Sequence, residues 1–194
     1  MECRLVEETE ATGDVLDTYK EIKQTLNTAE LPNWIKALGA HPSLLKANWE
    51  KVKHTIVEGT IPALLKELII FRVSVLNGSP YCSACHAHGA LQLDKSLNFD
   101  DMMALSEGKT LSQLPKPYQV ALAIVPRVTA DPHSFSDADL AALKAQGFTD
   151  LEVMELFAQG DIALMFNAIT MLYRVPLDPE YRPVIDSSLH SCAS

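Results

Sequence analysis

The sequence predicts an all-α protein, and three observations carry this prediction. The pattern of apolar and polar residues is helical through nearly all of the 194-residue chain. No hairpin dipeptide stands between two alternating runs of β-branched residues, which is the main local signal for strands. Proline and capping residues also stand repeatedly where helices would begin.

The predicted helices follow one another along most of the chain. They span residues 14–27, 33–38, 42–56, 62–77, 80–93, 99–107, 115–130, 137–146 and 149–173. Four of their starts are marked by Pro42, Pro62, Pro80 and Pro115. Proline suits these positions because its missing N–H costs nothing in the first turn of a helix.

The last two helices have capping signals of a different kind. Ser136 stands at an N-cap, and Asp139 follows in the first turn, where the helix dipole favours negative charge. Gly147 ends this helix. Thr149 and Glu152 then have the spacing of a capping box, which predicts the start of the longest helix.

Two of the predicted helices lack a wide solvated face. In IPALLKELIIFRVSVL (61–76), the polar residues Lys66, Glu67, Arg72 and Ser74 are scattered around the helix. The last long helix is similarly apolar around much of its circumference. Helices of this kind are buried, either at the centre of a domain or at a subunit interface.

The chain is long enough for one domain with a sizeable core. No Gly/Ser-rich linker or internal repeat divides it, so we expect a single domain over residues 1–194. Flexible ends are expected at about residues 1–12 and 186–194. Cys3 and Cys192 fall in these ends and are assigned no role.

Charge and hydropathy exclude several classes of partner. The net charge is −9 and no Lys/Arg-rich run occurs, which argues against binding to nucleic acid or to anionic membranes. The N-terminus lacks a secretory pattern, and no apolar run approaches the ~18 residues needed to span a bilayer. We therefore expect a cytoplasmic protein. Cysteines in that compartment are metal ligands, redox thiols or inert core residues before they are structural disulfides.

The stretch NGSPYCSACHAHG (77–89) holds most of the chemistry visible in the chain. Its C-S-A-C-H matches the pattern for covalent haem, but that attachment takes place in exported proteins and the motif is short. Structural zinc sites use two ligand pairs separated by a spacer, whereas Cys82, Cys85, His86 and His88 fall within seven residues of predicted helix. Neither a cofactor nor a metal is therefore expected.

Thiol chemistry has better local support in the same stretch. Ser79 stands at the N-cap and Pro80 at the first helical position, with the Ser79 hydroxyl expected to accept from the backbone N–H of Cys82. Cys82 lies in the first turn, where free N–H groups and the helix dipole favour a thiolate. Cys85 at i+3 and His86 at i+4 share its face, at a spacing that permits a disulfide. This cysteine–base arrangement is typical of nucleophilic or peroxidatic chemistry.

An inert alternative stands beside this interpretation, because cysteine is among the most buried residue types and two cysteines in a helix can be small core residues. Glu67 shifts the balance toward function. Buried glutamate is rare unless it is paired, and a neighbouring thiol–imidazole site gives a reason for it. A salt bridge from Glu67 to Arg72 or another basic residue is the alternative.

ELIIFRVSVLNGSPYCSACH resembles the signature of the alkylhydroperoxidase D-like branch of the carboxymuconolactone decarboxylase superfamily, typically E-L-I-x(n)-N-G-C-x-Y-C-x-x-x-H. Glu67 falls on the family's glutamate, Cys82 on its second cysteine and His86 on its histidine. Two later segments, SDADLAALKAQGFTDLEVMELFA and FNAITMLYRVPLDPEYRP, are similar to the second half of peroxidase-related members. The resemblance covers about residues 30–185.

The resemblance implies an alkylhydroperoxidase D-like helical bundle that forms homo-oligomers, commonly trimers or hexamers. It also implies that Cys82 attacks a hydroperoxide while Glu67 and His86 relay protons. The family's first cysteine, however, falls on Ser79, which cannot form a disulfide. The resolving role is therefore left to Cys85, to an external thiol, or to nothing.

The expected function is a thiol-dependent peroxidase or disulfide oxidoreductase with an antioxidant role, acting on a hydroperoxide with an external thiol or disulfide reductant. Two other functions stay open. One is a non-redox enzyme of the same superfamily that uses Glu67 and His86 for decarboxylation or lactone proton transfer. The other is a catalytically decayed oligomeric helical protein, of which Ser79 is the first sign.

Overall fold

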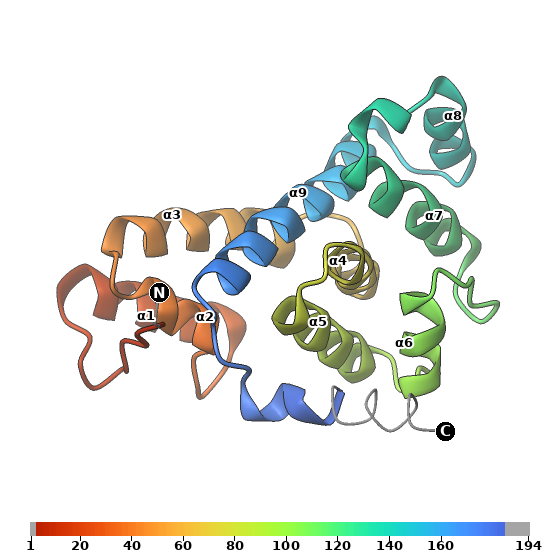
Figure 1. Ribbon diagram of the computed structural model, residues 1–194. Coiled ribbons are helices and arrows are strands. Elements are labelled where there is room, and N and C mark those ends of the chain that lie inside the picture. Colours follow the sequence, from red (N-terminus) through yellow and green to blue (C-terminus); the bar gives the residue numbers. More distant parts are fainter. Residues whose placement is uncertain (1–2, 185–194) are drawn as a thin grey trace.

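The computed structural model describes residues 3–184 and consists of helices joined by short loops (Figure 1). The elements are α1 (Gly13–Leu26), α2 (Asn33–Leu38), α3 (Pro42–Val52), the π-helix η1 (Lys53–Val57), α4 (Ala63–Leu76), α5 (Pro80–Leu93), α6 (Phe99–Ser106), α7 (Lys116–Ala130), the 3₁₀-helix η2 (Pro132–Ser134), α8 (Asp137–Ala145), α9 (Asp150–Leu172) and the 3₁₀-helix η3 (Pro179–Tyr181). The described residues contain no strand, so the predicted all-α class is confirmed. The predicted helices are all present, with ends that differ by a residue or two, except that the third ends in the π turn of η1.

Helix α4 lies at the centre of the molecule, which is one of the two places that its apolar circumference allowed. Figure 1 shows it almost end-on, with α5 and α9 beside it and α6 and α7 on its other side. Its polar side chains each have a partner instead of a shared solvated face. These partners are Glu155 for Lys66, His86 for Glu67, the Ser106 carbonyl for Arg72 and Asn167 for Ser74.

A tight reversal of the chain joins α4 to α5. Gly78 has a φ of +66°, a left-handed conformation that glycine adopts at little cost. The backbone N–H of Ser79 then donates to the Ser74 carbonyl at 2.9 Å. This short connection places α5 directly against α4, and it brings the cysteine turn beside Glu67.

The two ends of the described chain contact the helices around the site. Near the start, the Val6 N–H donates to the Lys36 carbonyl at 3.0 Å, and Ala11 is buried. These contacts involve residues for which the sequence predicted a flexible end. After α9, the chain crosses the lower side of Figure 1, where η3 lies against α5. Residues 1–2 and 185–194, which include Cys192, lie outside the described residues.

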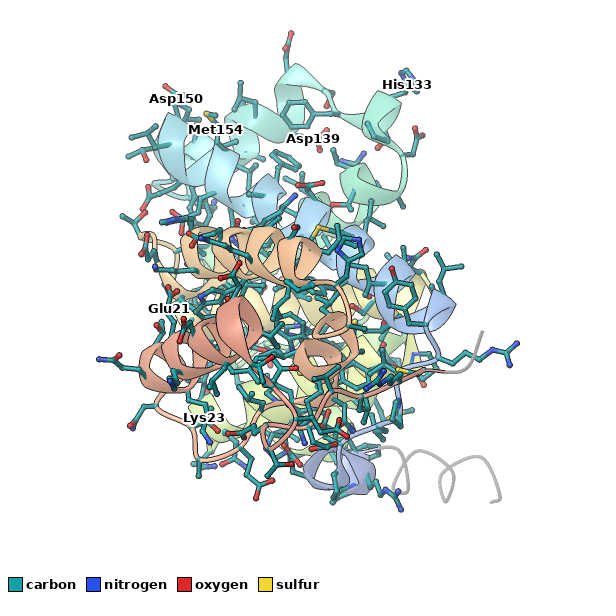
Figure 2. All side chains as sticks on the ribbon, turned by 90° about the vertical axis from the view of Figure 1, so that its left-hand side faces the viewer. Glu21, Lys23, His133, Asp139, Asp150 and Met154 are labelled. Atoms are coloured by element: carbon teal, nitrogen blue, oxygen red, sulfur yellow. The ribbon has the colours of Figure 1, made fainter. Side chains whose placement is uncertain are left out.

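Residues of α8 and the start of α9 form one end of the molecule. Figure 2 shows Asp150 and Met154 there, at the end away from Glu21 and Lys23 of α1. Met154 is 70% exposed although it is apolar. Among the helices of residues 3–184, none has the length and apolar character needed to cross a membrane.

Candidate functional site

A cavity of about 70 Å³ lies beside the first turns of α5. It is lined by Cys82, Cys85 and His86, so the structure brings together the residues that the helical spacing placed on one face. Trp34 and Phe166 form an aromatic wall, with ring centroids 4.7 Å apart in an edge-to-face arrangement. A larger apolar cavity of about 310 Å³ lies between α4, α5 and α6, but none of the predicted site residues lines it.

Glu67 of α4 is joined to the site by a hydrogen bond with His86. The Nδ1 atom of His86 lies 2.7 Å from Oε2 of Glu67, and the two side chains are 15% and 19% exposed. Since a carboxylate can only accept, His86 carries its hydrogen on Nδ1 in this pair and leaves Nε2 as the basic nitrogen. Arg72, the alternative partner for Glu67, donates instead to the Ser106 carbonyl at 2.8 Å.

Gly89 makes room for the Glu67 carboxylate. A Cβ atom at this position would lie 2.6 Å from Oε2 of Glu67, closer than a side chain is normally found. A glycine inside a helix costs about 1 kcal/mol relative to alanine. Its presence in the middle of α5 is therefore explained by the close approach of Glu67.

Cys82 is a buried, protonated thiol. It is 4% exposed, and its Sγ lies 3.5 Å from Oγ1 of Thr170 on α9. Thr170 donates its own hydrogen to the Phe166 carbonyl at 2.8 Å, so its oxygen is free to accept from the thiol. Burial raises the pKa of Cys82, and side-chain hydrogen bonds with Thr170 and Ser79 oppose this rise only in part. The helix dipole was expected to favour the Cys82 thiolate, but burial favours the neutral thiol more strongly.

Ser79 is the N-cap residue of α5, as predicted, but its side chain makes no capping hydrogen bond. The expectation that its hydroxyl accepts from the Cys82 backbone N–H is therefore wrong. Ser79 is 1% exposed, and its Oγ lies 3.4 Å from Oγ1 of Thr170. A buried hydroxyl needs a polar partner, and here Thr170 of α9 supplies one.

Cys85 is partly exposed and, like Cys82, is a free thiol. Its pKa lies well above the ordinary value, first because of burial and then because of the negative charge of Glu67. A hydrogen bond with the Tyr181 hydroxyl acts in the opposite direction. The two thiols therefore differ in surroundings: hydroxyl groups of Ser79 and Thr170 at Cys82, and a carboxylate and a phenol at Cys85.

Three polar residues near the site, Tyr81, Asp178 and Tyr181, were assigned no role from the sequence. The Tyr81 hydroxyl donates to Asp178 and accepts from the Trp34 N–H at 3.3 Å. Asp178 also accepts from the Asn33 N–H at 2.9 Å, and the Tyr181 ring packs edge-on against the Tyr81 ring. The available signal was D-P-E-Y (178–181), in which Asp before Pro can start a helical turn.

His88, the other histidine of the motif, does not line this cavity. The ring of His88 faces Tyr181, with centroids 5.5 Å apart. Over residues 3–184, no three His, Cys, Asp or Glu side chains are grouped so as to hold a metal ion. Of the four possible metal ligands of the motif, Cys82, Cys85 and His86 therefore line the cavity, whereas His88 packs against Tyr181.

Comparisons with known proteins agree with this fold. Residues 43–97 match the model of the carboxymuconolactone decarboxylase family, a segment that contains Glu67 and the cysteine motif. A comparison with curated protein sequences gives no significant match. Similar solved structures include the alkylhydroperoxidase AhpD core of a peroxidase-related protein from Ralstonia eutropha JMP134, with a TM-score of 0.80 and 20% identity over 92% of each chain.

Two other solved structures are similarly close. A peroxidase-related protein from Silicibacter sp. TM1040 has a TM-score of 0.75 and 21% identity over 93% of each chain. The debrominase Bmp8, solved as a cysteine-to-alanine variant with 2,3,4-tribromopyrrole, has a TM-score of 0.77 and 21% identity over 95% of this chain and 96% of its own. Residues 43–97 thus resemble the carboxymuconolactone decarboxylase family, and the chain as a whole shares the fold of these alkylhydroperoxidase D-like and peroxidase-related structures.

Proposed function

We propose that this protein is a thiol-dependent peroxidase in which Cys82 reduces a hydroperoxide and Cys85 resolves the oxidised product. The observation that carries the proposal is the convergence of Cys82, Cys85 and His86 on one small cavity, with Glu67 bonded to His86. A cavity of about 70 Å³ has room for a few water-sized groups, which suits a hydroperoxyl group.

The first step needs a base, because Cys82 is protonated at rest. With Nδ1 held by Glu67, Nε2 of His86 takes the thiol proton as the hydroperoxide enters. The thiolate attacks the terminal oxygen of the hydroperoxide, and the O–O bond breaks. The departing alkoxide takes the proton from His86 and leaves as an alcohol, so Cys82 becomes a sulfenic acid.

The second step forms the disulfide. The Cys85 sulfur attacks the sulfur of the Cys82 sulfenic acid, and the S–O bond breaks. The hydroxyl leaves with the Cys85 proton as water. Cys82 and Cys85 lie at i and i+3 on α5, a spacing at which the Cα atoms are close enough for a disulfide. An external thiol then reduces the disulfide by thiol–disulfide exchange.

The test is mass spectrometry of the purified protein before and after a small excess of hydroperoxide. We expect a loss of about two mass units on the peptide that carries Cys82 and Cys85, from removal of two hydrogens. Cys82→Ser should abolish this loss and peroxide consumption, whereas Cys3→Ser serves as the matched control and should change neither. An unmodified peptide, at peroxide levels that oxidise a reference low-pKa thiol, would refute the proposal.

A second candidate is non-redox acid–base catalysis by Glu67 and His86, of the kind for which the carboxymuconolactone decarboxylase family is named. The observation that favours it is the raised pKa of the Cys82 thiol, beside a fully formed Glu67–His86 pair. Such an enzyme should act on a carboxylated lactone and tolerate Cys82→Ser. It should lose activity in His86→Gln.

We further propose that the protein self-associates, as the family resemblance implies. Leu151 and Met154, at the start of α9, are 76% and 70% exposed. They lie three residues apart on one helix and therefore share a face. Adjacent exposed apolar side chains of this size are a feature of protein contact surfaces.

A further inference from the structure

A pair of buried hydroxyl groups lies next to the Cys82 sulfur. Oγ1 of Thr170, on α9, is 3.5 Å from Sγ of Cys82 and 3.4 Å from Oγ of Ser79. Thr170 is 3% exposed and Ser79 is 1% exposed, so neither hydroxyl is solvated. Thr170 therefore joins the thiol to the serine, and the reaction as described so far gives neither hydroxyl a task.

The Thr170 oxygen is held in place by the end of α9. Its hydroxyl donates to the Phe166 carbonyl at 2.8 Å, and the Asn167 carbonyl lies 3.3 Å away. Its own carbonyl accepts from the Val175 N–H at 2.9 Å, just after the helix ends. The oxygen thus stays beside the Cys82 sulfur, while the hydroxyl hydrogen can turn about the Cβ–Oγ1 bond.

Ser79 is fixed against the same stretch of α9 from the other side of the contact. Ser74 donates its hydroxyl to Oδ1 of Asn167 at 2.9 Å, and both side chains are fully buried. The Ser79 backbone N–H in turn donates to the Ser74 carbonyl at 2.9 Å. Because the Ser79 hydroxyl makes no capping bond, its hydrogen is available to the Thr170 oxygen.

These contacts allow the hydroxyls two arrangements. While Cys82 is protonated, its S–H donates to the Thr170 oxygen, and the Thr170 hydrogen stays on the Phe166 carbonyl. Once the proton has moved to His86, the sulfur can only accept. The Thr170 hydrogen then turns to the sulfur, and Ser79 donates to the Thr170 oxygen. The Phe166 carbonyl keeps its backbone hydrogen bond within α9, so nothing is left unpaired.

We propose that Thr170 is a hydroxyl switch for Cys82, accepting from the thiol at rest and donating to the sulfur during attack, with Ser79 as the positioning residue that supports it. This inference rests on the proposed function and deepens its first step. A hydrogen bond to a charged group is stronger than one to a neutral group, so the switch favours the state that attacks the hydroperoxide. The position where the resemblance places the family's first cysteine thus supplies a hydroxyl donor.

The neighbouring titratable groups are engaged in other ways. They are Tyr81, Cys85 and His86 on the helix of Cys82, and Glu67 on α4. Tyr81 donates to Asp178, and Cys85 is itself a neutral thiol. His86 is held by Glu67 and carries the proton that Cys82 gives up. Thr170 therefore acts in addition to this base, and the base stays the same in the variants below.

The first experiment measures alkylation of Cys82 by iodoacetamide against pH in a Cys85→Ser background, with the modified peptide identified by mass spectrometry. Thr170→Val keeps the shape and removes the hydroxyl, so the midpoint should rise by about one pH unit. Thr170→Ser restores the hydroxyl and should restore the midpoint. Thr18→Val is the matched control, because it removes a buried α1 hydroxyl that also bonds one turn back, and it should change nothing.

Two outcomes would overturn the inference. One is a midpoint in Thr170→Val equal to that of the parent. The other is an equal shift in Thr170→Val and Thr170→Ser, which would assign the effect to packing. Circular dichroism of each variant establishes that the helices are retained.

The role of Ser79 is tested by a double-mutant cycle on the same midpoint. Ser79→Ala should raise it by about half a unit, and in the Thr170→Val background it should raise it no further, because Ser79 acts through Thr170. Additive shifts would overturn this order of the two hydroxyls. Should Thr170→Val fail to fold, an unchanged midpoint in Ser79→Ala overturns the inference by itself.

A single-turnover experiment connects the switch to the reaction. With Cys85 present and one equivalent of hydroperoxide, sulfenic acid at Cys82 should form about tenfold more slowly in Thr170→Val and at the native rate in Thr170→Ser. Equal rates in Thr170→Val and the native protein would overturn the role of the switch in attack. If the native protein reduces no hydroperoxide, the proposed function fails, yet the alkylation midpoints still decide whether Thr170 stabilises the thiolate.

Discussion

Glu67 links the base of the candidate site to its second thiol. It holds Nδ1 of His86 at 2.7 Å, and its charge also raises the pKa of Cys85 beyond the effect of burial. One carboxylate thus has opposite effects on the two proposed steps. It supports proton removal from Cys82, and it disfavours ionisation of Cys85.

Glu67→Gln should therefore change two measurements in opposite directions. Peroxide consumption should fall by about 10²-fold, because His86 loses the partner that orients it. The pKa of Cys85 should fall, because the neighbouring negative charge is gone, and its alkylation at neutral pH should become faster. Glu107→Gln, at the end of α6, is the control. Slower alkylation of Cys85 in Glu67→Gln would contradict this account of the site.

At this scale the sequence predicted the residues on α5 and also Glu67 on α4, but it missed those that come from the C-terminal segment. Cys82, Cys85 and His86 were found because i, i+3 and i+4 positions of a helix share a face. Tyr181 and Asp178 lie about a hundred residues further along, and only the tertiary fold brings them to α5. The protonation of Cys82 was also missed, because burial is a property of the packed molecule.

At the scale of elements, α5 is shaped by its contact with α4. Gly89→Ala should raise the intrinsic helix propensity of α5 by about 1 kcal/mol. The added Cβ, however, would displace the Glu67 carboxylate. Peroxide consumption should therefore fall, as it should in Glu67→Gln. Denaturant unfolding and peroxide consumption measure the two effects separately. The double variant should be no less active than Glu67→Gln alone; a further loss would mean that Gly89 acts by another route.

A second contact between elements joins α9 to the loop before α4. Glu155 accepts from the Thr60 and Ile61 N–H groups at 3.0 and 3.1 Å, and it pairs with Lys66 at 3.1 Å. The Lys66 side chain is 3% exposed and also donates to the carbonyl of Ile56, within the π turn of η1. The sequence predicted a buried α4 but gave no partner for this lysine.

Glu155→Gln should destabilise the fold by about 3 kcal/mol, because it leaves the Lys66 charge buried without its counter-ion. Burial alone would raise the pKa of Glu155, but hydrogen bonds from Thr60, Ile61 and Lys66 lower it below its ordinary value of 4.5. The stabilisation is therefore complete above pH 4.5 and is lost as pH falls through the folded-state pKa. Urea unfolding at neutral and acidic pH measures both effects.

The variant Glu155→Gln should also show a weaker loss of stability in acid than the native protein, since the titrating group is absent. Adding Lys66→Met to it removes the unpaired charge and should recover part of the lost stability. An unchanged acid response in Glu155→Gln, or no recovery in the double variant, would contradict this role for the pair.

At the scale of the whole molecule, the site is assembled from α2, α4, α5, α9 and the C-terminal segment around the central α4. Local signals predicted where the helices begin and end, because caps and prolines act within a few residues. They could not predict which helices pack together, since many arrangements bury an apolar helix equally well. The family resemblance supplied that arrangement, and the similar structures agree with it.

The exposed apolar residues at the start of α9 lead to a prediction for the assembly. In light scattering coupled to gel filtration, the native protein should have a mass of three or six protomers, as the resemblance implies. Leu151→Glu combined with Met154→Glu should shift it toward the monomer, because charges would be buried at the contact. Leu172, 71% exposed near the other end of α9, is the matched control, and Leu172→Glu should leave the mass unchanged.

The masses of the Leu151/Met154 and Leu172 variants also indicate whether the contact between copies lies near the candidate site. The start of α9 lies at the end of the molecule away from α1, whereas Thr170 contacts Cys82 near the other end of the same helix. A monomeric Leu151/Met154 variant should therefore keep its thiol chemistry, with the alkylation profile of Cys85 unchanged. If Leu172→Glu dissociates the assembly instead, the contact between copies lies next to Thr170. Subunit association would then be coupled to the proposed reaction.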